Sequence, residues 1–232
     1  MGWDIVQYRP ATHPLARRAR LLKDYRIDLV LDVGANTGQY ARQLRELGYK
    51  GRIVSFEPLS SAVAELRRAA AYDANWQVRN HACGAENGKR EIRVAANSQS
   101  SSFLPMKAEH LDAFPDSCYI GTEVVEIKRL DTIFEEVAGP EAKIWLKLDV
   151  QGFEAAVVEG SSGCLERIRA IQAEVSLQAM YEGETTLIDF LPLMAQKGFL
   201  LVGLETYLSD PSTCHLLQVE CIFRRTKCPS KK

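Results

Sequence analysis

The sequence predicts an α/β domain built on a mostly parallel sheet, and two observations support this. Short apolar runs alternate with amphipathic helical patterns between residues 28 and 81, with short connections, and the same alternation returns between residues 143 and 225. The last two strand-like runs are joined by a short link without a helix, which predicts a hairpin. We therefore expect right-handed parallel crossovers and one antiparallel strand at a sheet edge.

The individual elements follow in chain order. We expect strands at 28–33, 52–56, 76–81, 143–149, 169–175, 199–204 and 216–224. We expect helices at 14–23, 39–47, 60–70, from 153 onward and 186–197. Ser60 or Ser61 is expected to cap the third helix, while Gly48 and Gly198 end the helices that precede them.

The middle of the chain is less regular. Residues 90–94 and 123–127 alternate apolar and charged side chains, as edge strands or solvent-facing strands do. The stretch 97–117 between them is rich in serine and contains Pro105 and Pro115. A long irregular segment of this kind is either a binding loop or a disordered one, and we favour the binding loop.

Composition excludes several classes of protein. The 232 residues suit one domain, which we place at 28–225, with a helical segment at 1–27 and a tail at 226–232. A net charge of -1 gives no basic field for nucleic acid. The six cysteines show no C-x-x-C pair, and neither a signal peptide nor an apolar run of roughly 18 residues is present. We therefore expect a cytoplasmic protein with reduced thiols and no membrane span.

The most informative segment is 29–38, a buried strand that runs into a turn bracketed by Gly34 and Gly38. Ligands of open α/β sheets bind at such junctions, outside the carboxyl ends of the strands. A second strand ends at Glu57, 23 residues after Gly34, and an acid at this spacing suits a ribose diol. One adenosine-bearing ligand would explain both features.

The residues of the turn narrow the choice of ligand. The segment lacks the three glycines of G-x-G-x-x-G, and the chain contains no G-x-x-x-x-G-K-[ST]. Asp32 at the mouth of the turn would repel phosphates and attract a cation. A cationic adenosine ligand without phosphate is therefore favoured over NAD or ATP, and S-adenosylmethionine fits this description.

Other polar residues follow the strand ends and are candidates for the same cleft. Asp149 ends a strand and is the favoured group to orient an acceptor or take its proton, although it could instead cap the next helix. Asn80 and Ala82 are candidates for the adenine end. His81 is a weaker candidate for proton transfer, since a lone histidine at a strand end is more often structural. Glu174, at the end of its strand, is a second candidate carboxylate of the pocket and could hold Mg²⁺ together with Asp149.

Seven motifs in order along the chain together indicate a family. These are LDVGANTG (31–38), FEP (56–58), NHACG (80–84), SSSF (100–103), RLDT (129–132), KLDVQGFE (147–154) and AEVS (173–176). In this order and spacing the chain resembles the FkbM family of S-adenosylmethionine-dependent methyltransferases. The resemblance covers roughly residues 28–225.

The resemblance implies a class I methyltransferase (Rossmann-like) fold, with a seven-stranded sheet whose final hairpin supplies the antiparallel strand. It places Asp32, Gly34, Asn36 and Gly38 at the methionine part of the donor, with Ala35 beside them. It also places Glu57 and the adjacent Pro58 at the ribose, Asn80 and Ala82 near adenine, and Asp149 near the transferred methyl group.

The expected activity is O-methylation of a sugar hydroxyl on a glycolipid, polysaccharide or glycosylated metabolite. The alternatives are methylation of a polyketide or other small-molecule hydroxyl, and a non-catalytic module that only binds the cofactor. Intact Asp32, Glu57 and Asp149 argue against the non-catalytic module. The sequence sets neither the acceptor nor the oligomeric state.

Overall fold

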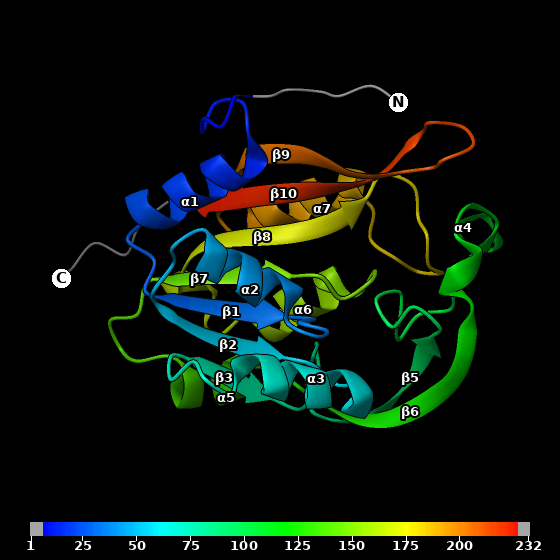
Figure 1. Cartoon of the computed structure of the whole chain (residues 1–232), viewed down its shortest axis with the longest axis horizontal. Helices are drawn as coiled ribbons and strands as arrows, with labels where there is room; N and C mark the ends of the chain where they lie inside the picture. The colour runs from blue at the N-terminus through cyan, green and yellow to red at the C-terminus, as the bar shows by residue number, and fades with distance from the viewer. Residues whose placement is uncertain (1–6, 227–232) are drawn as a thin grey trace.

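A computed structural model describes residues 7–226 and shows a seven-stranded sheet between two layers of helices (Figure 1). In spatial order the strands are β3 (Trp76–Arg79), β2 (Arg52–Phe56), β1 (Leu29–Val33), β7 (Ile144–Leu148), β8 (Ile168–Ser176), β10 (Leu216–Arg225) and β9 (Phe199–Ser209). The parallel sheet and the final hairpin are confirmed. Of the expected tail, residues 227–232 lie outside the described part of the chain.

The position of the antiparallel strand differs from the prediction. β10 runs antiparallel to both β8 and β9, so it lies second from the edge, and β9 forms the edge itself. The helix that connects β8 to β9 packs across the sheet, and this crossover leaves a space one strand wide. The chain then turns back and fills that space with β10.

Helices cover both faces of the sheet. On one face lie α1 (Pro14–Asp24), α2 (Gln39–Glu46) and α3 (Ser60–Ala70), and on the other lie α5 (Leu130–Val137), α6 (Glu154–Gly160) and α7 (Leu187–Gln196). Alternate strand residues serve the two layers: Val30 packs with the first set of helices, and Leu31 packs with the second. Both are fully buried.

A second, three-stranded sheet stands beside the first (Figure 1). It consists of β4 (Ala82–Cys83), β6 (Tyr119–Lys128) and β5 (Gly88–Ala95), in that order, so the two alternating segments do form strands. The serine-rich stretch 97–117 connects β5 to β6 and contains α4 (Ala108–Ala113) and the short 3-10 helix η1 (Pro115–Ser117). A further 3-10 helix, η2 (Leu165–Arg167), precedes β8.

Two helices begin where expected but are not capped as expected. The N-cap of α3 is Leu59 and makes no side-chain cap, so neither Ser60 nor Ser61 fills that role. Carboxylates of other elements accept the backbone N–H groups there, Glu57 from Leu59 at 2.9 Å and Glu123 from Ser60 at 3.2 Å. The N-cap of α6 is Phe153, so the alternative cap role of Asp149 is not realised.

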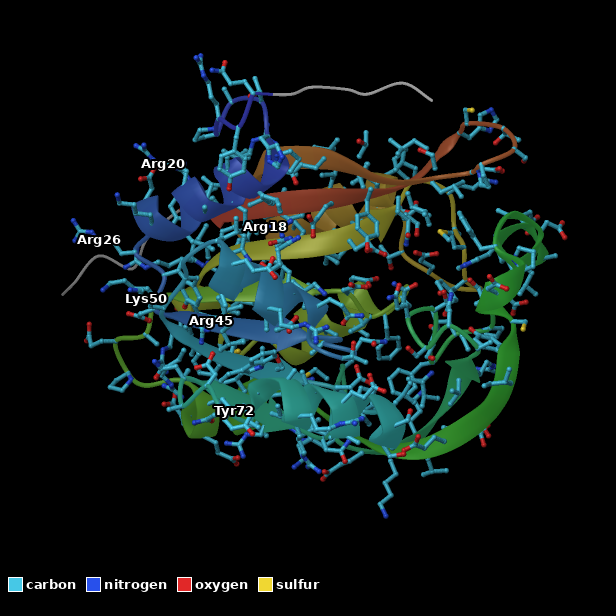
Figure 2. The ribbon with its side chains drawn as sticks, in the orientation of Figure 1. Arg18, Arg20, Arg26, Arg45, Lys50 and Tyr72 are labelled. Atoms are coloured by element: carbon cyan, nitrogen blue, oxygen red, sulfur yellow. The ribbon has the colours of Figure 1, made fainter. Side chains whose placement is uncertain are left out.

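Helix α1 is held against β9 and β10, at one edge of the sheet, by two ion pairs. Figure 2 shows Arg18 of α1 pointing inward, whereas Arg20 and Arg26 point away from the molecule. The Arg18 guanidinium lies 2.5 Å from the Glu220 carboxylate of β10, and Arg17 lies 2.8 Å from Glu205 of β9. Within residues 7–226 no helix is both long enough and apolar enough to cross a bilayer.

Candidate active site

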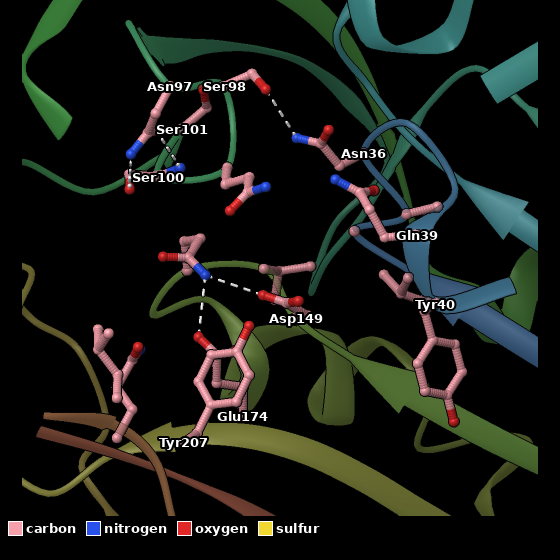
Figure 3. Close-up of a pocket in the computed structure, with 18 of the residues that line it drawn as sticks. Asn36, Gln39, Tyr40, Asn97, Ser98, Ser100, Ser101, Asp149, Glu174 and Tyr207 are labelled. Carbon is pink, nitrogen blue, oxygen red and sulfur yellow. Dashed lines mark hydrogen bonds between the residues drawn. The ribbon is translucent and has the colours of Figure 1, made fainter. Parts of the chain in front are cut away.

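A cavity of about 940 Å³ lies at the carboxyl ends of the parallel strands, where the sequence places the ligand. Its walls come from the loops after β1, β2 and β7, from the 97–117 stretch, from α1 and α2, and from β9 and β10. Figure 3 shows the serine-rich loop on one side of this cavity and Tyr207 of β9 on the other, with Asp149 between them. The cavity therefore has one end over β1 and β2 and another over β8 to β10.

The glycine turn after β1 is held by the neighbouring strand ends. The backbone N–H groups of Gly34 and Ala35 both donate to the Phe56 carbonyl, at 3.0 and 3.1 Å. Gly34 has a φ of +79°, and a Cβ built there would overlap the Asp149 carbonyl oxygen. Only glycine fits this position, because the backbones of β1 and β7 approach so closely. The open side of the turn is left for a ligand.

Glu57 fixes the shape of the same turn from the end of β2. Its two carboxylate oxygens accept the N–H groups of Asn36 at 2.8 Å and Leu59 at 2.9 Å. The Asn80 amide donates to the Glu57 and Pro58 carbonyls, at 3.1 and 3.0 Å, and so holds this loop from β3. Burial raises the pKa of Glu57 to about 7, although the two backbone hydrogen bonds act in the opposite direction.

A buried lysine lies between two carboxylates at the centre of the site. The Lys147 ammonium of β7 donates to Asp149 Oδ2 at 2.9 Å and lies 3.8 Å from Asp32 Oδ1. Burial acts to lower the pKa of Lys147, but the charges of Asp149 and Asp32 raise it overall. Asp32 is fully buried, accepts a hydrogen bond from Ser55, and has its pKa raised by desolvation. The lysine therefore carries a permanent charge.

Gln151 connects the carboxylates of two strands. Its amide nitrogen donates to Asp149 Oδ1 at 2.9 Å and to Glu174 Oε1 at 3.2 Å. The Tyr181 hydroxyl donates to the Gln151 amide oxygen at 2.8 Å and so turns the amide nitrogen toward the two acids. Gln151 has a φ of +53° and precedes Gly152, which forms the tight turn before α6.

The structure brings together most, but not all, of the residues expected at the site. The cavity is lined by Gly34, Ala35, Asn36, Glu57, Pro58, Ala82 and Asp149. The other four do not line it, namely Asp32, Gly38, Asn80 and His81. Asp32 lies beneath the turn against Lys147, and a Cβ at Gly38 would meet Trp76 and Leu66 on the α3 side. Asn80 lies behind the loop after β2, which it holds by hydrogen bonds to the Glu57 and Pro58 carbonyls.

His81 is placed where its side chain has a structural role. Its ring packs on Phe56 with a centroid separation of 5.3 Å, and its Nδ1 is hydrogen-bonded to the Ala82 carbonyl at 3.0 Å. Burial lowers the pKa of His81. The position of His81 does not support the prediction of proton transfer. His110, by contrast, is buried and lines the cavity from the serine-rich stretch.

Sequence reasoning missed the roles of Lys147, Gln151 and Tyr207. A signal for the first was present, because Lys147 interrupts an otherwise apolar central strand, where a charge requires a partner. The sequence carries no such signal for Gln151 and Tyr207, because their place in the site depends on neighbours from other strands. The Mg²⁺ possibility finds no support: within residues 7–226 no cluster of three or more acids, cysteines or histidines could hold a metal ion. The cation beside Asp149 is the lysine.

Comparison with known proteins identifies the family. The family model described as the Methyltransferase FkbM domain matches residues 32–201, which is most of the chain. The chain belongs to the FkbM methyltransferase family. It is also 29% identical over 179 residues, 71% of each chain, to the 2-O-methyltransferase NoeI of Sinorhizobium fredii (strain NBRC 101917 / NGR234). The protein is therefore an S-adenosylmethionine-dependent methyltransferase.

Solved structures agree on the fold of this FkbM methyltransferase. The magnesium protoporphyrin IX methyltransferase of Synechocystis PCC 6803, solved with bound SAM, has a TM-score of 0.51 and 11% identity, over 91% of this chain and 78% of that one. An rRNA methylase from Streptococcus thermophilus has a TM-score of 0.51 and 10% identity, over 93% and 98%. The class I methyltransferase fold expected from the sequence is confirmed.

Glu57 provides a test of donor binding through pH. We expect Glu57 to hold the ribose; because a ribose diol donates its hydrogens to an ionised carboxylate, binding would then require Glu57 to lose its proton. With a pKa near 7, the affinity for S-adenosylhomocysteine is expected to rise roughly tenfold between pH 6 and pH 8. Glu57→Gln should weaken binding and remove this dependence. Calorimetric titration across this pH range measures both, and a Glu57→Gln protein with the wild-type pH profile would exclude the carboxylate.

The raised pKa of Glu57 also makes the free energy of unfolding depend on pH. Because Glu57 binds its proton more tightly in the folded protein than in the unfolded chain, its contribution to the free energy of unfolding decreases as the pH rises from about 4.5 to about 7. Glu57→Gln should flatten that part of the curve in urea titrations of the ligand-free protein.

Proposed function

We propose that this protein transfers the methyl group of S-adenosylmethionine to a sugar hydroxyl of a glycolipid, polysaccharide or glycosylated metabolite. The donor half of the cavity fits a cationic donor without phosphate. The close backbone at Gly34 to Asn36 suits the methionine part, Glu57 suits the ribose, and Ala82 suits the adenine. The carboxylates of Asp149 and Glu174 supply negative charge for the sulfonium.

The observation that carries the acceptor proposal is the chemistry of the other half of the cavity. Gln43, Gln218 and Glu205 line it with hydrogen-bonding groups, and the ring of Tyr207 stands on its β9 wall. A sugar offers hydroxyls at its edge and C–H groups on its face, so amides, carboxylates and one aromatic ring suit it. The relative NoeI, whose name describes a 2-O-methyltransferase, is consistent with a hydroxyl acceptor.

The charges in the cavity argue against a polyphosphate acceptor. Arg18 and Lys147 both line it, but each is paired with carboxylates, at 2.5 Å to Glu220 and 2.9 Å to Asp149. Neither side chain is therefore available to neutralise phosphates, on which nucleic-acid binding depends. This supports the prediction that RNA and DNA are not acceptors.

The test is incubation with methyl-labelled donor and a panel of acceptors. The panel contains glycolipids, neutral oligosaccharides, phenolic polyketides without sugars, and transfer RNA. Label on a sugar hydroxyl, located by mass spectrometry of the hydrolysed product, is the expected result. The Asp149→Asn protein, purified in the same way, controls for contaminating enzymes. Label only on the polyketides or on RNA would overturn the proposal.

A further inference from the structure

Transfer to a hydroxyl requires a group that removes the hydroxyl proton, and Asp149 is poorly arranged to do so. Both of its carboxylate oxygens already accept hydrogen bonds, Oδ2 from the Lys147 ammonium and Oδ1 from the Gln151 amide, each at 2.9 Å. Its negative charge is also compensated by a buried cation at contact distance. A proton taken up by Asp149 would remove the charge that balances this buried cation.

Glu174 lies beside Asp149, at the end of the next strand of the sheet, and has a different environment. Its side chain lines the cavity although only 7% of the residue is exposed. Gln151 donates to Oε1 at 3.2 Å, and among residues 7–226 no cation forms an ion pair with this carboxylate. Figure 3 shows Glu174 at the same end of the cavity as Tyr207, which is the end that we assign to the acceptor.

We propose that Glu174 is the proton acceptor of the reaction, and that Lys147, Asp149 and Gln151 are positioning residues that hold the acceptor site in place. This inference rests on the proposed transfer to a hydroxyl. The acceptor oxygen forms a bond to the methyl carbon as the carbon–sulfur bond breaks, and the electron pair of that bond stays on sulfur. The hydroxyl proton passes to Glu174, so a carboxylate and a sulfonium become a neutral acid and a neutral thioether.

The charges around Glu174 suit the transfer of a proton to its carboxylate. Burial, followed by the charge of Asp149, raises the pKa of Glu174 well above that of an ordinary glutamate, while Lys147 lowers it. The titratable groups that face it are Lys147 on β7, Asp149 directly after β7, Glu154 on α6, Tyr181 in the loop after β8, Tyr207 on β9 and Glu220 on β10. A sulfonium placed in the same cavity stabilises the ionised form. Donor binding should therefore release the proton and prepare Glu174 for the reaction.

Proton release gives a test that needs no acceptor. Binding is measured calorimetrically in two buffers of different ionisation enthalpy, once with S-adenosylmethionine and once with S-adenosylhomocysteine. The two ligands share their ribose, so any contribution from Glu57 is common to both and cancels in the difference. The wild-type protein should release more protons to the donor than to the neutral thioether, over pH 6 to 8.

The Glu174→Gln variant decides whether this difference belongs to Glu174. Glutamine has the same shape and still accepts the hydrogen bond from Gln151, so the fold should be kept, which a melting curve checks. The difference in proton release between the two ligands is expected to vanish. Glu182→Gln, which changes an exposed acid on the same loop as Tyr181, should leave the difference unchanged. A difference that persists in Glu174→Gln overturns the proposal.

Single-turnover kinetics with a methylated acceptor of the panel then test the chemical step. Loss of a general base costs typically 10²- to 10⁴-fold in rate, so Glu174→Gln should slow methyl transfer by that factor. The affinity for the donor should fall far less than the rate does, and the remaining rate should no longer rise with pH. A Glu174→Gln protein that transfers methyl groups at the wild-type rate, with the wild-type pH profile, also overturns the proposal. If no hydroxyl of the panel is methylated, the proposed function fails, whereas the proton-release experiment still decides the role of Glu174.

Discussion

Replacing Asp149 with asparagine is expected to reduce turnover about 100-fold or more, while the affinity for S-adenosylmethionine falls by less than tenfold. The amide keeps the size of the side chain but removes the charge that pairs with Lys147 at 2.9 Å. The buried lysine is then left with Asp32, at 3.8 Å, as its counter-ion. An unbalanced cation beside the sulfonium weakens donor binding, and the loss of turnover comes from the displaced Gln151, which misplaces the acceptor.

The measurement separates kcat from the donor KM, with binding constants from calorimetry as a check. Asp116→Asn is a suitable control, because Asp116 also lines the cavity but belongs to the short helix η1, away from Lys147. A kcat of Asp149→Asn that equals that of the wild type would remove Asp149 from the reaction. Equal losses in donor affinity and in kcat/KM would mean that it acts in donor binding only.

Gly34→Ala is expected to abolish measurable donor binding and to destabilise the fold. The added Cβ would overlap the Asp149 carbonyl oxygen, and the residue would also have to adopt a φ of +79°. Overpacking costs about 1–3 kcal/mol and backbone strain about 1 kcal/mol or more. For a chain of this size the melting temperature should fall by roughly 4 to 15 °C. The strand ends of β1 and β7 must separate to admit the methyl group, and the site loses its shape.

Gly48→Ala is the matched control for this change. Gly48 has a φ of +83°, nearly the same as Gly34, but a Cβ built there meets no atom within 4 Å. It therefore reproduces the backbone strain without the overlap. Calorimetric titration and melting curves of both variants separate the two effects. Donor binding by Gly34→Ala as tight as that by Gly48→Ala would show that the close approach to Asp149 is unimportant.

The strand ends could be read from the sequence because local pattern determines them. Buried parallel strands are short apolar runs, and the acids that end β2 and β7 stand directly after such runs at Glu57 and Asp149. Helix α5 was missed although its apolar residues Leu130, Ile133 and Val137 recur at helical spacing.

The parts that were not predicted depend on contacts between distant segments. Asp32 was expected to face the ligand, but a residue in the central strand has neighbours on both sides, and Lys147 lies opposite it in the register of β1 and β7. His81 was a candidate because of its position after a strand, but its ring packs on Phe56 and does not line the cavity. No pattern in the sequence shows which strands are neighbours in the sheet.

The position of α1 against β9 and β10 shows which parts of the cavity lie outside the segment that the family model matches. The matched family model ends at residue 201 and begins at residue 32, yet Arg18 and Glu220, which bind each other across the acceptor end of the cavity, both lie outside it. Tyr207 and Gln218 lie outside it as well. On the assignment proposed above, the donor end of the cavity lies within the matched segment, whereas part of the acceptor end is formed by the segments that flank it. Two relatives can then keep every contact to the donor and still methylate different molecules.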